Sequence, residues 1–345
     1  MGFYEVGGLS LLSDYGDRTM GVADNSIRDT AHQSPPSPAV SPAAQHYGTL
    51  PFSVPSATMQ VMDELRADRL VWIFGTGRSG STWLASMMGD MAGGRLWNEP
   101  LVGKLFGDFH TGARPKSLRS KNFVMADAHR QAWLEGIRLF VLRVADSRFA
   151  DAEEGEWIVV KEPNGSVGAP YLAAAFPRSA LVLLIRDPRD VAASAIDRHR
   201  PGGGAYEWRK SEGMVRDRAS RNPDAFIEGQ AKRYMRNVGA AKRAYEAHEG
   251  PKVMVRYEDL RADTLRTMRG IYSTLEIPTD EEELARVVKK HAWENISEEK
   301  KGRGKFHRKA NPGGWREDLT SHQARSVEKI TAPLLREFYR VESER

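Results

Sequence analysis

A short stretch of glycine and hydroxyl residues has the chemistry of an anion site. Residues 78–83 read RSGSTW and follow an apolar run at residues 70–75. Glycine permits a tight turn, the amides that open a following helix point at one spot, and Arg78 supplies fixed positive charge. An ordinary Gly/Ser turn is the alternative for this stretch taken alone. The G-x-x-x-x-G-K-[ST] pattern of triphosphate-binding loops is not met, because the spacing is shorter and no lysine precedes the hydroxyl.

A second arginine motif follows another apolar run. Arg186 ends the run at residues 180–185, Pro188 suits the first turn of a helix, and Ser194 lies eight positions after the arginine. An arginine at a strand end and a serine two turns into the next helix can reach one phosphate. The alternative is a capped helix in which Asp187 or Asp190 balances the helix dipole.

A basic segment lies near the C-terminus. Residues 300–316 contain seven Lys and Arg residues and no acid. Such a run is either a solvated loop or, beside a doubly charged phosphate, a lid that orders on binding.

The elements that must position these motifs alternate along the chain. Apolar runs predict strands at residues 70–75, 156–161, 180–185 and 252–257, and helices are expected at residues 81–91, 168–176 and 188–197. Buried strands separated by helices favour a parallel sheet covered on both faces. We therefore expect a three-layer α/β domain.

The N-terminal segment differs from the rest in composition. Residues 31–58 hold six of the 18 prolines, so we expect residues 1–58 to be extended or disordered and residues 59–345 to form the domain. The charge is −3 over residues 1–58 and +8 over the remainder, which alone does not choose between nucleic acid, membrane and small-molecule partners. Without a signal-like segment or a 20-residue apolar run, we expect a cytoplasmic protein with no transmembrane segment. We also expect no nucleic-acid partner.

Together the motifs resemble those of the sulfotransferases that use 3′-phosphoadenosine 5′-phosphosulfate (PAPS), over about residues 69–339. The resemblance implies a P-loop-like α/β fold and release of adenosine 3′,5′-bisphosphate (PAP). It also implies that Arg186 and Ser194 bind the 3′-phosphate and that Trp83 faces the adenine. The 5′-phosphosulfate would be held by the loop residues Arg78, Ser79, Gly80, Ser81 and Thr82.

Further cofactor residues follow from the same resemblance. Arg308 and Lys309 fall in register with the first two residues of the family's R-K-G-x-x-G-D-W segment, whereas Ala310 replaces its glycine. A backbone contact at Ala310 would require a negative φ. Tyr257 and Trp293 would border the adenine, although each aromatic could equally belong to the core.

The general base is also identified by resemblance. Lys161, Glu162 and Pro163 stand where many cytosolic members have K-T-H, so a histidine base is not expected there. Tyrosylprotein and carbohydrate sulfotransferases instead use a glutamate after the first helix, which corresponds to Glu99. The resemblance thus implies Glu99 as base, with Lys161 and Arg78 stabilising the transferred group and the leaving group.

Several alternatives stay open from the sequence. Glu99 could be a surface carboxylate, and Glu162 and His110 are reserve candidates for the base. No metal site is expected, because no cluster of His, Asp and Glu has ligand spacing. A P-loop kinase or ATPase and a non-catalytic nucleotide-binding module are the competing functions. The acceptor, a hydroxyl or an amine on a carbohydrate, lipid, peptide or natural product, is not identified by the sequence, nor is the oligomeric state.

Overall fold

The computed structural model describes residues 67–113, 115–153, 155–214, 217–305 and 308–339. The segment predicted to be extended, residues 1–58, lies outside the described residues, so that prediction is not tested. Within the described part of the chain, no helix is both long and apolar enough to span a bilayer.

Five parallel strands form one sheet in the order β2-β3-β1-β4-β5. Their bounds are β1 (Leu70–Phe74), β2 (Gly94–Asn98), β3 (Trp157–Lys161), β4 (Ala180–Ile185) and β5 (Lys252–Arg256). The four predicted strands correspond to β1, β3, β4 and β5, and every residue of β1 and β4 is buried. A central parallel strand must be covered on both faces, which is why these strands read as unbroken apolar runs.

Helices cover both faces of the sheet. The described α-helices are α2 (Ser81–Gly89), α3 (Val102–Gly112), α4 (Pro115–Leu118), α5 (Arg130–Arg148), α6 (Ala169–Ala175), α7 (Pro188–His199), α8 (Gly204–Ser211), α9 (Arg218–Arg221), α10 (Pro223–Ala247), α11 (Tyr257–Ala262), α12 (Thr264–Thr274), α13 (Glu281–Lys290), α14 (Trp315–Asp318) and α15 (Ser321–Phe338). Short 3₁₀ turns are η1 (Asp127–His129), η2 (Ser166–Gly168), η3 (Trp293–Asn295) and η4 (Glu298–Lys300). The three predicted helices correspond to α2, α6 and α7.

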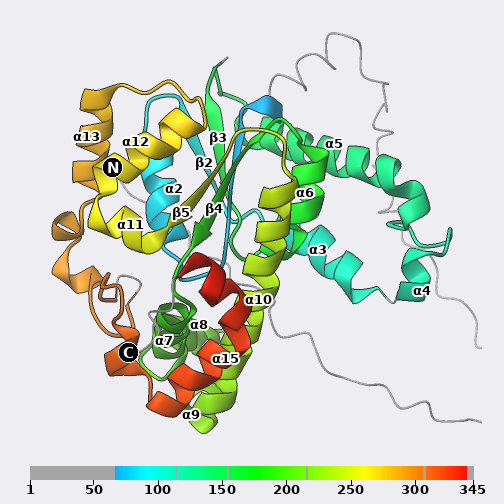
Figure 1. Cartoon of the computed structure of the whole chain (residues 1–345). Coiled ribbons are helices and arrows are strands. Elements are labelled where there is room, and N and C mark those ends of the chain that lie inside the picture. The colour runs from blue at the N-terminus through cyan, green and yellow to red at the C-terminus, as the bar shows by residue number, and fades with distance from the viewer. Residues whose placement is uncertain (1–66, 114, 154, 215–216, 306–307, 340–345) are drawn as a thin grey trace, which may run out of the picture. The chain divides into compact units, whose positions relative to one another are not determined.

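Two hydrophobic clusters divide the sheet residues by face. Trp72 and Phe74 of β1 pack in one cluster with side chains of α5, α6 and α10. Val71 and Ile73 pack in the other with side chains of α2 and α12. Successive strand residues point to opposite faces, so the two clusters are the two sides of a three-layer α/β domain, as expected. Figure 1 shows α2, α11, α12 and α13 on one side of the sheet and α5, α6 and α10 on the other.

Candidate active site

The carboxyl ends of the five strands lie at one edge of the sheet, because all five are parallel. A predicted site residue stands at each of these ends or within a few residues of it. The five are Arg78 after β1, Glu99 after β2, Lys161 at the end of β3, Arg186 after β4 and Tyr257 after β5. This edge therefore brings together the motifs that lie far apart in the sequence.

The loop after β1 turns sharply by means of two left-handed residues, Arg78 (φ 72°) and Gly80 (φ 89°). A Cβ at Gly80 would lie 2.5 Å from the ring of Tyr257, so both conformation and space demand glycine there. The buried Ser79 hydroxyl donates to the Thr76 carbonyl at 2.7 Å. Ser79 thus holds the loop together by its side chain.

Helix α2 begins directly after this loop, with Ser81 as its first residue and Thr82 as its second. Gly80 precedes them and has no side chain with which to cap the helix. Free amides at a helix start and the positive end of the helix dipole attract an anion. The loop and the first turn of α2 together have the form of a phosphate site.

The three arginine motifs meet around the same point. Arg78 Nε donates to Ser194 Oγ at 2.9 Å, and Arg186 Nη1 donates to the Arg78 carbonyl at 3.0 Å. Arg308 Nη1 donates to the carbonyl of Ala193, next to Ser194, at 2.9 Å. The segments that the sequence analysis assigned to the 5′- and 3′-phosphates are therefore joined by direct hydrogen bonds.

Positive charge is concentrated at this junction. Burial, together with repulsion from Arg198, Arg186 and Arg308, lowers the pKa of Arg78 to about 9. Four cations held together repel one another unless an anion lies between them. The cluster is therefore suited to a ligand with more than one negative group.

Arg198 is a member of this cluster that the sequence analysis missed. It lies in the last turn of α7. The signal was present, because Arg198 stands four residues after Ser194 and therefore on the same face of the helix.

Arg186 is held in place but keeps a buried donor without a partner. Its guanidinium lies 4.2 Å over the ring of Tyr257, a cation–π contact. Its Nε is buried and has no hydrogen-bond partner among the described residues. A buried donor of this kind costs free energy unless a ligand accepts from it.

Two of the three predicted adenine-bordering aromatics contact each other. Trp83 and Tyr257 form an edge contact with ring centroids 6.4 Å apart. Trp83 Nε1 also donates to the His291 carbonyl at 2.9 Å, and Tyr257 is buried. Trp293 lies in η3 with the Lys301 ammonium 5.2 Å over its ring. The role of Trp293 stays a prediction.

The C-terminal basic motif divides into residues with different surroundings. Arg308 pairs with Asp318 as well as contacting Ala193. Lys309 Nζ pairs with Glu317 at 2.8 Å and with Asp318 at 3.2 Å, so its charge is already matched by acids. Of the two, only Arg308 joins the arginine cluster.

Ala310 does not have the negative φ required in the sequence analysis. Its φ is 48°, in the left-handed region that favours the family's glycine. Its carbonyl accepts from Arg261 Nε at 3.1 Å. Ala310 thus keeps the backbone shape of a glycine position, and its predicted contact with the cofactor remains untested.

Glu99 lies against the catalytic lysine candidate. Its Oε1 accepts from Lys161 Nζ at 2.6 Å, and Lys161 Nζ also donates to Thr82 Oγ1 at 3.0 Å. The other carboxylate oxygen, Oε2, accepts from Asn164 Nδ2 at 2.8 Å. Lys161 is 3% exposed and shielded from water, whereas the Glu99 side chain is 22% exposed. Asn164, three residues after Lys161, was not identified from the sequence.

Glu162 has a different environment from the adjacent Lys161. It is fully buried, and its Oε2 accepts from the Leu101 amide at 3.0 Å, at the start of α3. Burial raises its pKa to about 8, although backbone amides around the helix start oppose the shift. Lys161 contacts Thr82 and Glu99, whereas the adjacent Glu162 contacts the start of α3 instead.

His110 lies in an aromatic group on α3. Its Nδ1 is 2.8 Å from the Tyr171 hydroxyl, and its ring packs near Trp133 and Tyr171. Burial lowers its pKa. These contacts tie His110 to the packing of α3 against α5 and α6.

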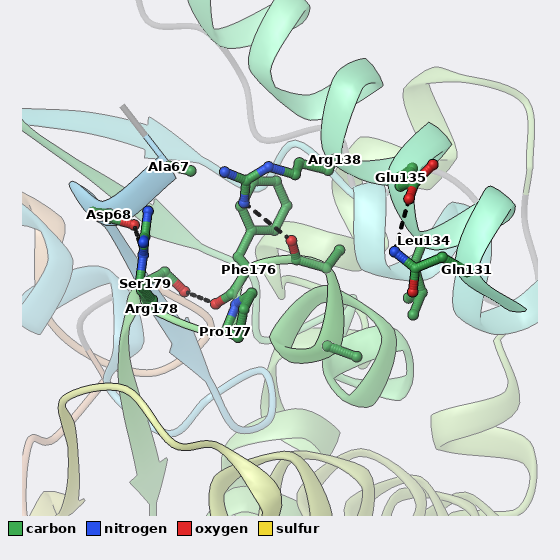
Figure 2. Close-up of a pocket in the computed structure, with 12 residues that line it drawn as sticks. Ala67, Asp68, Gln131, Leu134, Glu135, Arg138, Phe176, Pro177, Arg178 and Ser179 are labelled. Atoms are coloured by element: carbon green, nitrogen blue, oxygen red, sulfur yellow. Dashed lines mark hydrogen bonds and ion pairs between the residues drawn. The ribbon is translucent and has the colours of Figure 1, made fainter. Parts of the chain in front are cut away.

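A cavity of about 380 Å³ lies at the other edge of the sheet. Figure 2 shows its lining, which includes Ala67 just before β1 and Phe176 to Ser179 just before β4. These are the amino ends of the strands, and no residue of the arginine cluster or of the Glu99–Lys161 pair lines the cavity. The predicted chemistry and this cavity are therefore separate features.

Comparison with known proteins identifies one family. The sequence model of the sulfotransferase family matches residues 71–281, more than half of the chain. A comparison with curated protein sequences finds no match.

Solved structures resemble the fold weakly. Mouse sulfotransferase SULT7A1 in complex with PAP is 14% identical, with 79% of this chain and 88% of that one covered and a TM-score of 0.47. Sulfotransferase STF9 from Mycobacterium avium is 16% identical, with 82% and 81% covered and a TM-score of 0.49. A sulfotransferase from Alicyclobacillus acidocaldarius is 17% identical, with 76% and 95% covered and a TM-score of 0.39. The assignment to the family therefore depends on the sequence match alone.

Proposed function

Because this chain belongs to the sulfotransferase family, its chemistry is sulfuryl transfer, and we propose that the donor is PAPS and the acceptor a hydroxyl or amine. In this proposal Glu99 is the general base, and Lys161 and Arg78 are the cations that stabilise the transition state. The cytoplasmic location expected from the sequence stays a prediction.

One observation carries the assignment of the catalytic residues. The ammonium of Lys161 contacts Thr82 on the phosphosulfate loop and Glu99 on the neighbouring strand end at once. A lysine between donor loop and base can respond to charge on the leaving group while it orients the carboxylate. This arrangement supports a base and a leaving-group cation that act on one reaction centre.

The residues present fit the proposed donor. A ligand with a 3′-phosphate and a 5′-phosphosulfate carries separated negative groups, and the cluster of Arg78, Arg186, Arg198 and Arg308 offers several cations for them. The unpartnered Nε of Arg186 supplies a buried donor. Gly80 lets the Tyr257 ring, which also lies under the Arg186 guanidinium, approach the start of α2 more closely than a Cβ would allow.

Each catalytic side chain then has a defined task. The donor supplies the sulfuryl group. A carboxylate oxygen of Glu99 takes the proton of the acceptor hydroxyl or amine while the acceptor oxygen or nitrogen attacks the sulfur of the donor. Asn164 holds Glu99 Oε2 and so orients the carboxylate. Lys161 Nζ and Arg78 provide positive charge where negative charge grows on the leaving bisphosphate and on the sulfuryl oxygens.

Thermal unfolding of the purified protein tests the donor. PAP should raise the melting temperature, since a ligand at 100 times its Kd stabilises the folded state by about 2.7 kcal/mol. ATP with magnesium should have little effect, because the loop lacks the lysine of triphosphate-binding proteins. Stabilisation by ATP with magnesium and not by PAP would contradict the proposal and favour the kinase-like alternative.

A further inference from the structure

The peptide bond that follows Arg186 is tethered on both sides. The Tyr234 hydroxyl donates to the Arg186 carbonyl at 2.9 Å. The Asp187 amide donates to Glu258 Oε1 at 3.0 Å. Side chains from two helices, α10 and α11, thus hold this peptide in one orientation.

Glu258 is itself held by a residue from the other end of the fold. Its second oxygen, Oε2, accepts from the Tyr339 hydroxyl at 2.9 Å. Tyr339 directly follows α15, and the Arg256 guanidinium lies 4.7 Å over its ring. Burial raises the pKa of Tyr339, so its hydroxyl stays a hydrogen-bond donor at neutral pH.

The dipeptide Tyr257–Glu258 also supports the guanidinium of Arg186. Tyr257 lies under the Arg186 guanidinium, and Glu258 follows it in the first turn of α11. A shift of this turn would therefore move the peptide and the guanidinium of Arg186 together.

We propose that Tyr339 is a positioning residue for the donor's 3′-phosphate, which it controls through Glu258 and the Arg186–Asp187 peptide. The inference rests on the proposed function, because it takes Arg186 to bind that phosphate. The chain of contacts runs from Tyr339 to Glu258 to the Asp187 amide. Loss of the Tyr339 hydroxyl leaves the half-buried carboxylate of Glu258 without one of its hydrogen-bond donors. Glu258 then holds the Arg186–Asp187 peptide less firmly.

Two ligands separate positioning from general destabilisation. Tyr339→Phe removes only the hydroxyl. The Kd for PAP should rise by about 3- to 10-fold, the range expected for one lost hydrogen bond. The Kd for adenosine 5′-phosphosulfate, which lacks the 3′-phosphate, should change by less than about twofold.

Tyr171→Phe is the matched control. It also removes a hydroxyl with a short side-chain contact, at 2.8 Å to His110, but lies away from Arg186 in the fold. Its affinities for both ligands should stay at the wild-type values.

Hydrogen exchange gives a readout that does not depend on ligand. The Asp187 amide should exchange faster in Tyr339→Phe than in the wild type, and at the wild-type rate in Tyr171→Phe. Glu258→Gln keeps an acceptor for that amide and should retain most of the protection and of the PAP affinity, whereas Glu258→Ala should lose both.

Equal losses of affinity for both ligands, or an unchanged exchange rate at Asp187 in Tyr339→Phe, would overturn the inference. If the wild-type protein binds neither ligand, the proposed function fails, and the exchange experiment still decides whether Tyr339 holds the peptide.

Discussion

Lys161 Nζ lies 2.6 Å from Glu99 Oε1 and 3.0 Å from Thr82 Oγ1. One buried ammonium thus joins the end of β3 to the residue after β2 and to the first turn of α2. This contact links the proposed base to the proposed donor loop.

The lysine should matter most when the leaving group is poor. Lys161→Ala is expected to lower turnover by about 10²-fold or more, because it removes a cation placed where charge develops. The defect should shrink with a sulfuryl donor whose leaving group is more acidic. Turnover measured with two donors checks this, and Lys232→Ala, at a side chain 70% exposed, is the control. The same defect with both donors would contradict a role in leaving-group stabilisation.

The arginine cluster should discriminate between ligands by their 3′-phosphate. Arg186→Ala and Arg308→Ala should each weaken PAP binding by about 1.5–3 kcal/mol, the range for losing a charge-assisted contact. Binding of adenosine 5′-phosphosulfate should hardly change. Calorimetric titration measures both, with Arg286→Ala at a 67% exposed side chain as control. Arg308 also pairs with Asp318, so unfolding of each variant must be measured alongside.

The strands that are buried on both faces, and the motifs that follow them, could be predicted from the sequence alone. β1 and β4 are buried throughout, so their apolar runs identified them. β2 was missed because its sequence, GRLWN, contains no apolar run, whereas the other edge strand, β5, has the run Val253–Val255. Helix α10 was not predicted either, although Asn222 and Pro223 mark its start by an N-cap and a proline in the first turn.

The site was predicted in its motifs but not in its supporting contacts. Motif order pointed to Arg78, Arg186, Arg308, Glu99 and Lys161. Partners such as Asn164 depend on how distant segments meet, which spacing along one sequence does not encode. Arg198 differs, because its spacing of four residues from Ser194 on α7 could have identified it.

Gly80 should not tolerate a side chain. Gly80→Ala places a Cβ at φ 89° and 2.5 Å from the Tyr257 ring, so we expect a loss of about 1–3 kcal/mol in unfolding free energy and weaker PAP binding. Gly136→Ala is the matched control, since Gly136 lies inside α5 with nothing within 4 Å of an added Cβ. That change should be neutral or stabilise by about 0.5–1 kcal/mol. Urea unfolding of both variants checks this, and equal stabilities would contradict it.

Glu162 should make the stability of the protein fall as pH rises. Burial raises its pKa to about 8 from the ordinary 4.5, so the folded state keeps a proton that the unfolded state releases. Its stabilising contribution is therefore full below about pH 4.5 and is lost as pH rises towards about 8. Glu162→Gln cannot titrate and should flatten the melting temperature across this interval. Parallel pH profiles for the two proteins would show that Glu162 does not hold that proton.

Turnover of Glu99→Gln tests the central claim most directly. The substitution keeps the shape of the side chain and removes its basicity, so turnover should fall by about 10²- to 10⁴-fold with PAPS affinity almost unchanged. Glu162→Gln is the matched control and should stay near the wild-type rate at pH 7, because the buried Glu162 already favours its neutral form. The assay follows sulfuryl transfer from an aryl sulfate to PAP, or from PAPS to a panel of hydroxyl and amine acceptors. Near-normal turnover in Glu99→Gln together with an inactive Glu162→Gln would contradict the account and move the base to the residue beside Lys161.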